Sequence, residues 1–185
     1  MRTISMLIKA FAVAAMFYAT QASAYFYVDD TTGSPTYNRP FADLSQLSGT
    51  GTAVPYDSFA FSVDTAGSYT FNSFALPIIP LSGRWDNMLF LYQGSFNPAS
   101  PLTNALIGND DLNAIGHSGF SFGLTTGVAY VLVTTGFNNT SEGKYLNTIQ
   151  GPGNVTAPVP EPETYALLLS GLGVVGFLAR RRRQG

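Results

Sequence analysis

Residues 57–63, DSFAFSV, decide the fold class, because apolar and small residues alternate there with the period of a β-strand. Phe59, Phe61 and Val63 fall on one face of such a strand, and serine or alanine occupies the positions between them. One face therefore suits a core and the other suits water, as in an antiparallel sheet with one solvated side.

The residues that follow predict a turn and a second strand. Residues 64–67, DTAG, carry turn-forming side chains and end on Gly67, which can adopt a positive φ. Residues 68–76 then resume the alternation through Tyr69 and Phe71. The two strands and their short connection predict a β-hairpin.

Further strands follow at short intervals along the chain. Residues 87–92, NMLFLY, are apolar on both faces and predict a central, buried strand. No helical periodicity occurs before the C-terminal tail, and 25–55 read as an irregular segment with turns. Seven or eight short strands predict an all-β fold, a single β-sandwich of jelly-roll type over 56–151, followed by a linker at 152–159. The other predicted strands are 119–124, 128–134 and 144–150.

The N-terminus has the three parts of a secretory signal peptide over residues 1–24. Arg2 and Lys9 are positively charged, and an apolar stretch at 10–19 would form the signal helix. Ala22 and Ala24 form the small-x-small pattern that signal peptidase cleaves. We expect the mature, exported chain to begin at Tyr25.

The C-terminal tail, residues 160–185, combines a short motif, an apolar stretch and a basic cluster. Pro160, Glu161 and Pro162 precede an apolar stretch at 165–179, which predicts a transmembrane helix. Its fifteen residues fall short of the ~20 that usually span a bilayer. The arginines that follow would stop transfer and stay in the cytoplasm. They are Arg180, Arg181, Arg182 and Arg183. From these residues alone, a permanent tail anchor remains open.

The triplet, the glycine-containing apolar stretch and the arginine cluster, in that order, resemble the PEP-CTERM sorting signal. That resemblance implies recognition by an exosortase in a Gram-negative bacterium and cleavage near Pro160–Pro162. It further implies transient anchoring in the inner membrane through the C-terminal helix, followed by release to the cell envelope or the extracellular space.

Residues 56–149 resemble the bacterial pre-peptidase C-terminal domain more loosely. The resemblance is carried by residues 57–63, by AGSYTF at 66–71, by WD at 85–86, by NDD at 109–111 and by TGVAYVLV at 126–133. It implies a β-sandwich that accompanies secreted enzymes and is not itself catalytic.

Charge and cysteine content narrow the possible partners. Residues 25–159 hold nine acidic and three basic side chains, so the net charge of the exported domain is 3 − 9 = −6. Nucleic acid is not expected as a partner, since binding phosphates requires basic patches. The chain contains no cysteine, which excludes disulfides and thiol chemistry.

Catalytic patterns are weak, and we expect no enzyme. Residues 115–120, IGHSGF, approach a nucleophile elbow around Ser118, but Phe120 stands where the second glycine is required. His117, the single histidine, would be the only imidazole base. A pair of acids for glycoside hydrolysis is not distinguished from turn aspartates.

Two candidate binding sites remain. Oxygen-rich side chains suit calcium, against the alternative of a solvated turn; they are Asp86, Asn109, Asp110 and Asp111. Calcium is the one cofactor considered, and its role would be structural. Trp85, the lone tryptophan, could stack on a sugar with Tyr56 or Tyr92, against the alternative of packing at the rim of the core.

These observations favour a non-enzymatic, exported surface or extracellular-matrix protein, associated with exopolysaccharide or biofilm. A carbohydrate-binding module for the cell's own polysaccharide is the alternative. A secreted hydrolase and an ice-binding protein are less favoured, because the catalytic set and a regular Thr-x-Thr repeat are both missing from the sequence.

Overall fold

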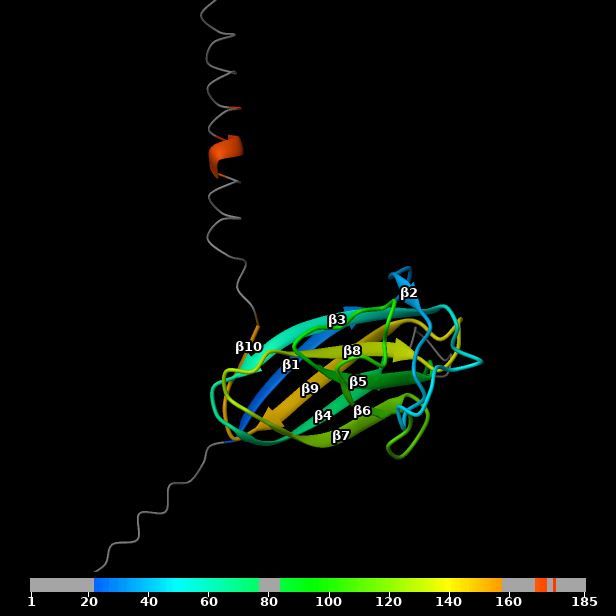
Figure 1. The fold of residues 1–185 in the computed structure, drawn as a ribbon, viewed down its shortest axis with the longest axis horizontal. Helices are drawn as coiled ribbons and strands as arrows, with labels where there is room; N and C mark the ends of the chain where they lie inside the picture. Colours follow the sequence, from blue (N-terminus) through cyan, green and yellow to red (C-terminus); the bar gives the residue numbers. More distant parts are fainter. Residues whose placement is uncertain (1–21, 77–83, 158–168, 173–174, 176–185) are drawn as a thin grey trace, which may run out of the picture.

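The computed structural model describes residues 22–76, 84–157, 169–172 and 175. Two antiparallel sheets pack face to face over residues 22–157 (Figure 1), which confirms the predicted all-β sandwich. One sheet has four strands in the order β1-β9-β4-β7, and the other has six, β10-β3-β8-β5-β6 with β2 beside β3. The strands are β1 (Ser23–Asp30), β2 (Thr36–Tyr37), β3 (Val54–Val63), β4 (Gly67–Ala75), β5 (Asn87–Gln93), β6 (Ala105–Asn109), β7 (His117–Leu124), β8 (Tyr130–Gly136), β9 (Lys144–Gly151) and β10 (Val155–Thr156).

The eight longer strands pair from the outside of the chain inward. β1 pairs with β9, β3 with β8, β4 with β7 and β5 with β6, all antiparallel. The first of these eight strands thus pairs with the last of them, and the two middle strands pair with each other, as in a long hairpin rolled into two sheets. This nested pairing agrees with the jelly-roll type expected from the sequence.

The predicted hairpin of residues 57–63 and 68–76 is wrong. Both segments are strands, but β3 lies in the six-stranded sheet and β4 in the four-stranded sheet. The turn between them crosses from one sheet to the other, so the two apolar faces meet across the core. The rings of Phe61 and Phe71, for example, lie 6.1 Å apart. Alternation and a short turn are the same in a hairpin and in this crossing, so the local sequence does not distinguish them.

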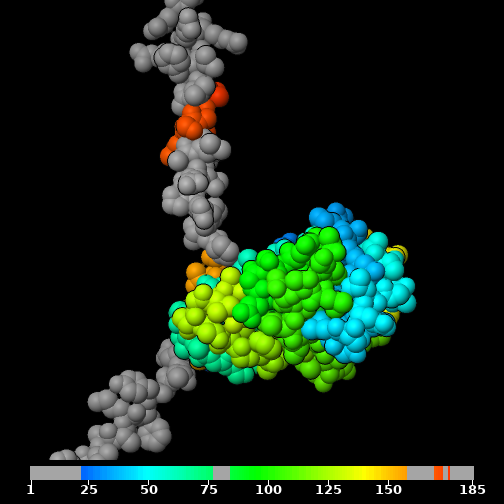
Figure 2. Space-filling view, viewed as in Figure 1, coloured from blue at the N-terminus to red at the C-terminus, as the bar shows by residue number. Residues whose placement is uncertain are grey.

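The prediction of a central, buried strand at 87–92 is confirmed by β5. Leu89 and Leu91 point into the core between the sheets, whereas Met88, Phe90 and Tyr92 point the other way and are also buried. Residues 31–53, which we call the covering segment, pack over that outward face together with the loop after β5. Figure 2 views the molecule from this side, with the covering segment in blue to cyan.

The expectation of an irregular segment over 25–55 is wrong for its first six residues, which belong to a strand. Residues 23–30 form β1, which pairs along its whole length with β9. Tyr25 and Tyr27 point inward and stack near Phe59, while Phe26 and Val28 point outward and are exposed. A strand that is apolar on both faces lacks clear alternation. β6 and β10 were also missed, and β10 falls within the expected linker at 152–159.

The signal peptide and most of the sorting tail lie outside the described residues. Of the predicted helix at 165–179, the structure describes Leu169–Leu172 and Val175, all helical. Among the described residues, no helix has the length and apolar character needed to cross a membrane.

Candidate functional site

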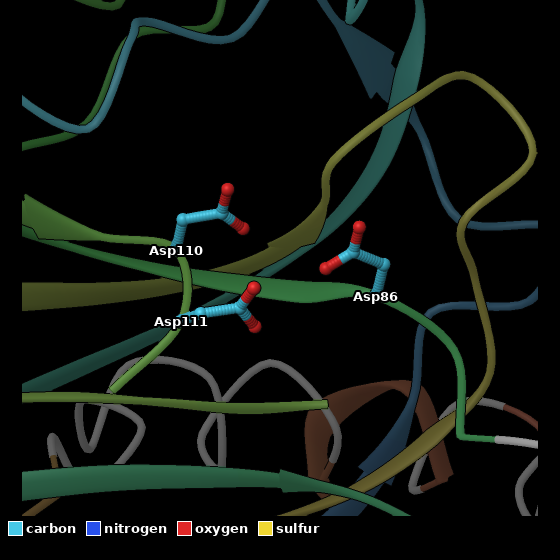
Figure 3. A group of neighbouring side chains, drawn as sticks. All are labelled: Asp86, Asp110 and Asp111. Atoms are coloured by element: carbon cyan, nitrogen blue, oxygen red, sulfur yellow. The ribbon is translucent and has the colours of Figure 1, made fainter. Parts of the chain in front are cut away.

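Three carboxylates meet at one end of the six-stranded sheet, where β5 begins and β6 ends. Asp86 directly precedes β5, and Asp110 and Asp111 directly follow β6. β5 and β6 pair with Leu89 opposite Asn109, which places the start of one strand beside the end of the other. One oxygen from each carboxylate lies within 4.8 Å of the others, and the groups face a common space (Figure 3).

Burial and the neighbouring carboxylates disfavour ionisation of two members of this acid cluster, Asp86 and Asp110. Burial, and then the carboxylates of Asp86 and Asp111, raise the pKa of Asp110 to about 6, while the Arg39 guanidinium acts in the opposite direction. Burial and the charge of Asp111 also raise the pKa of Asp86. The Oδ1 atoms of Asp86 and Asp110 are buried and have no hydrogen-bond partner. Such oxygens have the chemistry of ligands for a hard cation such as calcium.

The fourth predicted calcium ligand does not join the cluster. The Oδ1 atom of Asn109 accepts a hydrogen bond from the backbone N–H of Gly119, 2.9 Å away, and so links the end of β6 to β7. Three of the four predicted residues therefore come together, and calcium binding by these three stays a prediction.

Trp85 is half-buried and is held by two neighbouring residues. Its Nε1–H donates to the carbonyl of Lys144 at 2.9 Å, and its ring lies over Gly143, where an added Cβ would approach Cδ1 to 2.8 Å. Tyr92 is fully buried at the other end of β5, and its hydroxyl donates to the Pro101 carbonyl. The predicted pairing of Trp85 with Tyr92 is therefore wrong, while sugar stacking on Trp85 itself stays a prediction.

The residues that resembled a nucleophile elbow point to opposite sides of β7. Ser118 is fully buried between the sheets, and its hydroxyl donates to the backbone carbonyl of Asn87. The Nε2 atom of His117 lies 3.1 Å from Asn72 Oδ1 on the outward side, where the imidazole stacks on Phe74. The serine and the histidine are thus not arranged as nucleophile and base.

The residues assigned to processing are only partly described. The sorting motif Pro160-Glu161-Pro162 and Arg180–Arg183 lie outside the described residues. Ala22 is described, and Ala24 belongs to β1, where it pairs with Gln150. Cleavage after Ala24 would leave Tyr25–Asp30 to form the rest of that strand.

The outward face of the four-stranded sheet is a surface that the sequence reasoning missed. The pairing registers align Phe26, Thr148 and Asn72 in one row across β1, β9 and β4. Val28 and Phe74 lie in the next row, on either side of Leu146. Phe26 is 71% exposed and Val28 is 59% exposed. The i, i+2 spacing of Phe26 and Val28 is the sequence signal for this face. It was not used because the segment was expected to be irregular.

Comparison with known proteins identifies the tail. Residues 158–183 match the family described as the PEP-CTERM protein-sorting motif, which confirms the recognition of an exosortase-type sorting signal. The chain therefore carries the signal of an exported protein sorted to the cell envelope. No curated protein matches the chain. A solved structure, the K3 cleaved adhesin domain of Lys-gingipain from Porphyromonas gingivalis, is similar at 13% identity and a TM-score of 0.30, covering 68% of this chain and 91% of that one.

Proposed function

We propose that this chain is a non-enzymatic β-sandwich protein that an exosortase-type pathway delivers to the cell envelope or extracellular matrix, where it associates with exopolysaccharide. The observation that carries the proposal is the sorting motif at 158–183, which begins directly after the last residue described in the sandwich, Ala157. The cargo of the signal is thus one small, acidic, cysteine-free sandwich.

The positions of the chain ends support delivery by two processing steps. The Ser23 hydroxyl, at the start of β1, donates to Asn154 Oδ1 at 3.1 Å, just before β10. Both described ends of the sandwich therefore lie at the same end of the domain (Figure 1), and the acid cluster lies at the opposite end, where β5 begins. Signal peptidase and exosortase would act on segments leaving this shared end, with the opposite end directed away from the membrane.

The placement of polar groups supports a non-enzymatic role. Ser118, buried between the sheets, and His117, on the outer side, do not face each other. The acid cluster brings three carboxylates together where β5 begins and β6 ends, an arrangement suited to clamping these strand ends through a cation. A structural calcium there would join the β5 and β6 ends in a protein that has no disulfides.

The proposal is tested by intact mass spectrometry of the protein recovered from cells that make it. We expect the mature chain to begin at Tyr25 and to end near Pro160–Pro162, in the envelope or matrix fraction. A variant with Pro160→Ala, Glu161→Ala and Pro162→Ala should keep residues to Gly185 and remain with the membranes. A wild-type chain that ends at Gly185 would contradict processing and indicate a permanent anchor.

A further inference from the structure

The outward face of the four-stranded sheet stands out by its exposed apolar side chains. Among the domain's described large hydrophobic residues, Phe26 at 71%, Ile115 at 61% and Val28 at 59% are the most exposed. Two of these three point outward from β1, an edge strand of this sheet. Exposed apolar residues that lie next to each other on one sheet face indicate an interaction surface more strongly than scattered ones do.

The polar groups on the same face are almost all uncharged. Lys144 and Asp30 face each other at one margin and are the only charged residues that the pairing registers place outward on β1, β4, β7 and β9. The remaining polar residues there carry hydroxyl, amide or imidazole groups: Ser68, Thr70, Asn72, His117, Ser121, Thr148 and Gln150. The face is therefore close to neutral in a domain whose net charge is −6.

Aromatic rings and polar groups lie side by side on this face. Phe26 pairs with Thr148, which in turn pairs with Asn72. One row away, Phe74 stacks on His117 with ring centroids 4.3 Å apart, and His117 is oriented by its contact with Asn72. Sugar rings present C–H faces that stack on aromatic rings and hydroxyls that hydrogen-bond to amides, so this combination fits a glycan.

The size of the face favours a thin ligand over a protein. Four strands about 4.8 Å apart and six residue steps of about 3.4 Å give a flat area of ~14 by ~20 Å, or about 300 Å². A stable protein–protein interface buries about 800 Å² on each partner. A second copy of the chain would find too little surface here, whereas an extended polysaccharide would cross several rows.

We propose that the outward face of the β1-β9-β4-β7 sheet binds a neutral, extended polysaccharide, with Phe26 as the main stacking ring and Thr148 and Asn72 as hydrogen-bonding partners. The inference rests on the proposed function in that the exported domain meets a glycan outside the cell. The negative domain disfavours anionic polymers, and the neutral face has no charge that would attract them.

The test measures binding of the full chain, purified in mild detergent, to amorphous cellulose, curdlan and chitin as neutral polymers and to alginate as an anionic one. We expect at least one neutral polymer to bind more tightly than alginate. Phe26→Ser should weaken that binding at least about tenfold, as expected for the loss of one stacking ring. Raising salt from about 50 to about 500 mM should have little effect, because no charge pairs are involved.

Two further variants distinguish specific glycan binding from non-specific adsorption. Thr148→Val keeps the side-chain shape but removes the hydroxyl, so it should weaken glycan binding, whereas non-specific adsorption would increase. Leu102→Ser is the matched control, because Leu102 is 40% exposed in the loop before β6, away from this face, and its loss should not affect binding. EDTA should also leave binding unchanged, since the acid cluster lies elsewhere.

The inference is overturned if no neutral polymer binds the wild-type chain, if alginate binds best, or if Phe26→Ser binds as the wild type does. A dimer in solution that Phe26→Ser dissociates would instead assign the face to self-association. These outcomes are independent of processing. A chain that is processed normally but binds no glycan refutes this inference, and with it the proposed association with exopolysaccharide, but leaves the proposed sorting intact. An unprocessed chain that binds glycan refutes only the proposed sorting.

Discussion

On the six-stranded sheet, the apolar side chains that β5 and β8 point away from the core are all buried: Met88, Phe90, Tyr92, Val131 and Val133. On the four-stranded sheet, the outward positions mix hydroxyl and amide side chains with apolar ones, and Phe26 and Val28 remain exposed. The difference is the covering segment, residues 31–53, which packs on the first face, while the described part of the chain leaves the second face open.

The covering segment is held by a buried cation. Arg39 is 1% exposed, and its guanidinium donates to the Phe137 carbonyl from Nε and Nη2 and to the Pro40 carbonyl from Nη1. It also lies over the Phe137 ring, 4.9 Å from the centroid. The outward apolar residues of the six-stranded sheet are therefore buried and contribute to stability. Those of the four-stranded sheet stay exposed and are available to a ligand.

The largest effect should distinguish the two faces directly. Phe90→Ala removes a fully buried ring beneath the covering segment and should lower the free energy of unfolding by about 3–5 kcal/mol. The matched change on the open face, Phe26→Ala, should alter it by no more than about 0.5 kcal/mol. Urea denaturation measures both values. Equal losses would mean that the open face is also covered.

Removing the buried cation should come next in size. Arg39→Ala leaves the Phe137 carbonyl without two donors and opens a cavity under the covering segment, so we expect a loss of about 3 kcal/mol in the free energy of unfolding. Arg84→Ala, which changes an exposed arginine, is the control and should have little effect. An Arg39→Ala protein as stable as the control would show that the segment is held by its apolar contacts alone.

Calcium bound at the acid cluster, on the covered side of the molecule, should increase the free energy of unfolding without contacting the open face. For a dissociation constant near 0.5 mM, about 5 mM calcium should add roughly 1.4 kcal/mol to the free energy of unfolding. The pair Asp110→Ala, Asp111→Ala should abolish this gain, which thermal unfolding with and without EDTA would detect. The pair Asp29→Ala, Asp30→Ala, also adjacent aspartates, should retain it. No calcium shift in the parent protein would refute the site.

The pH dependence without calcium should give the smallest effect. The folded pKa of Asp110, about 6, lies above the unfolded value near 3.9, so the folded state binds more protons between these values. The stability that Asp110 contributes is then fully present below its unfolded pKa and is lost as the pH rises through 6. After allowance for solvent screening, we expect the metal-free protein to be about 1 kcal/mol more stable at pH 5 than at pH 7.

The matching variant checks the origin of that pH dependence. Asp110→Asn should remove most of the difference between pH 5 and pH 7 in EDTA. Asp43→Asn should not, because hydrogen bonds from Ser45 lower the pKa of Asp43 and move its titration to more acidic pH. A stability that rises from pH 5 to pH 7 in the parent would contradict the assigned direction.

The sequence could predict a candidate site where its residues lie directly beside predicted strands. Asp86, Asp110 and Asp111 flank two apolar segments, so pairing of those segments was enough to bring them together. Asn109 was predicted with them but turns to the Gly119 amide, a contact between sheets that the local sequence does not encode. The outward face of β1 was missed because strand β1 is apolar on both sides and lacks clear alternation.

The sequence by itself determined the class of the fold, the sorting signal and the acidic character of the exported domain. Strand periodicity depends on residues two apart, and the tail motif is contiguous, so both are local properties of the chain. Only the tertiary structure decided that residues 57–63 and 68–75 lie in opposite sheets, that β1 closes against β9, and that one outward face is covered and the other open. Those outcomes depend on which distant segments pack together, because burial is set by contacts between residues far apart in the chain.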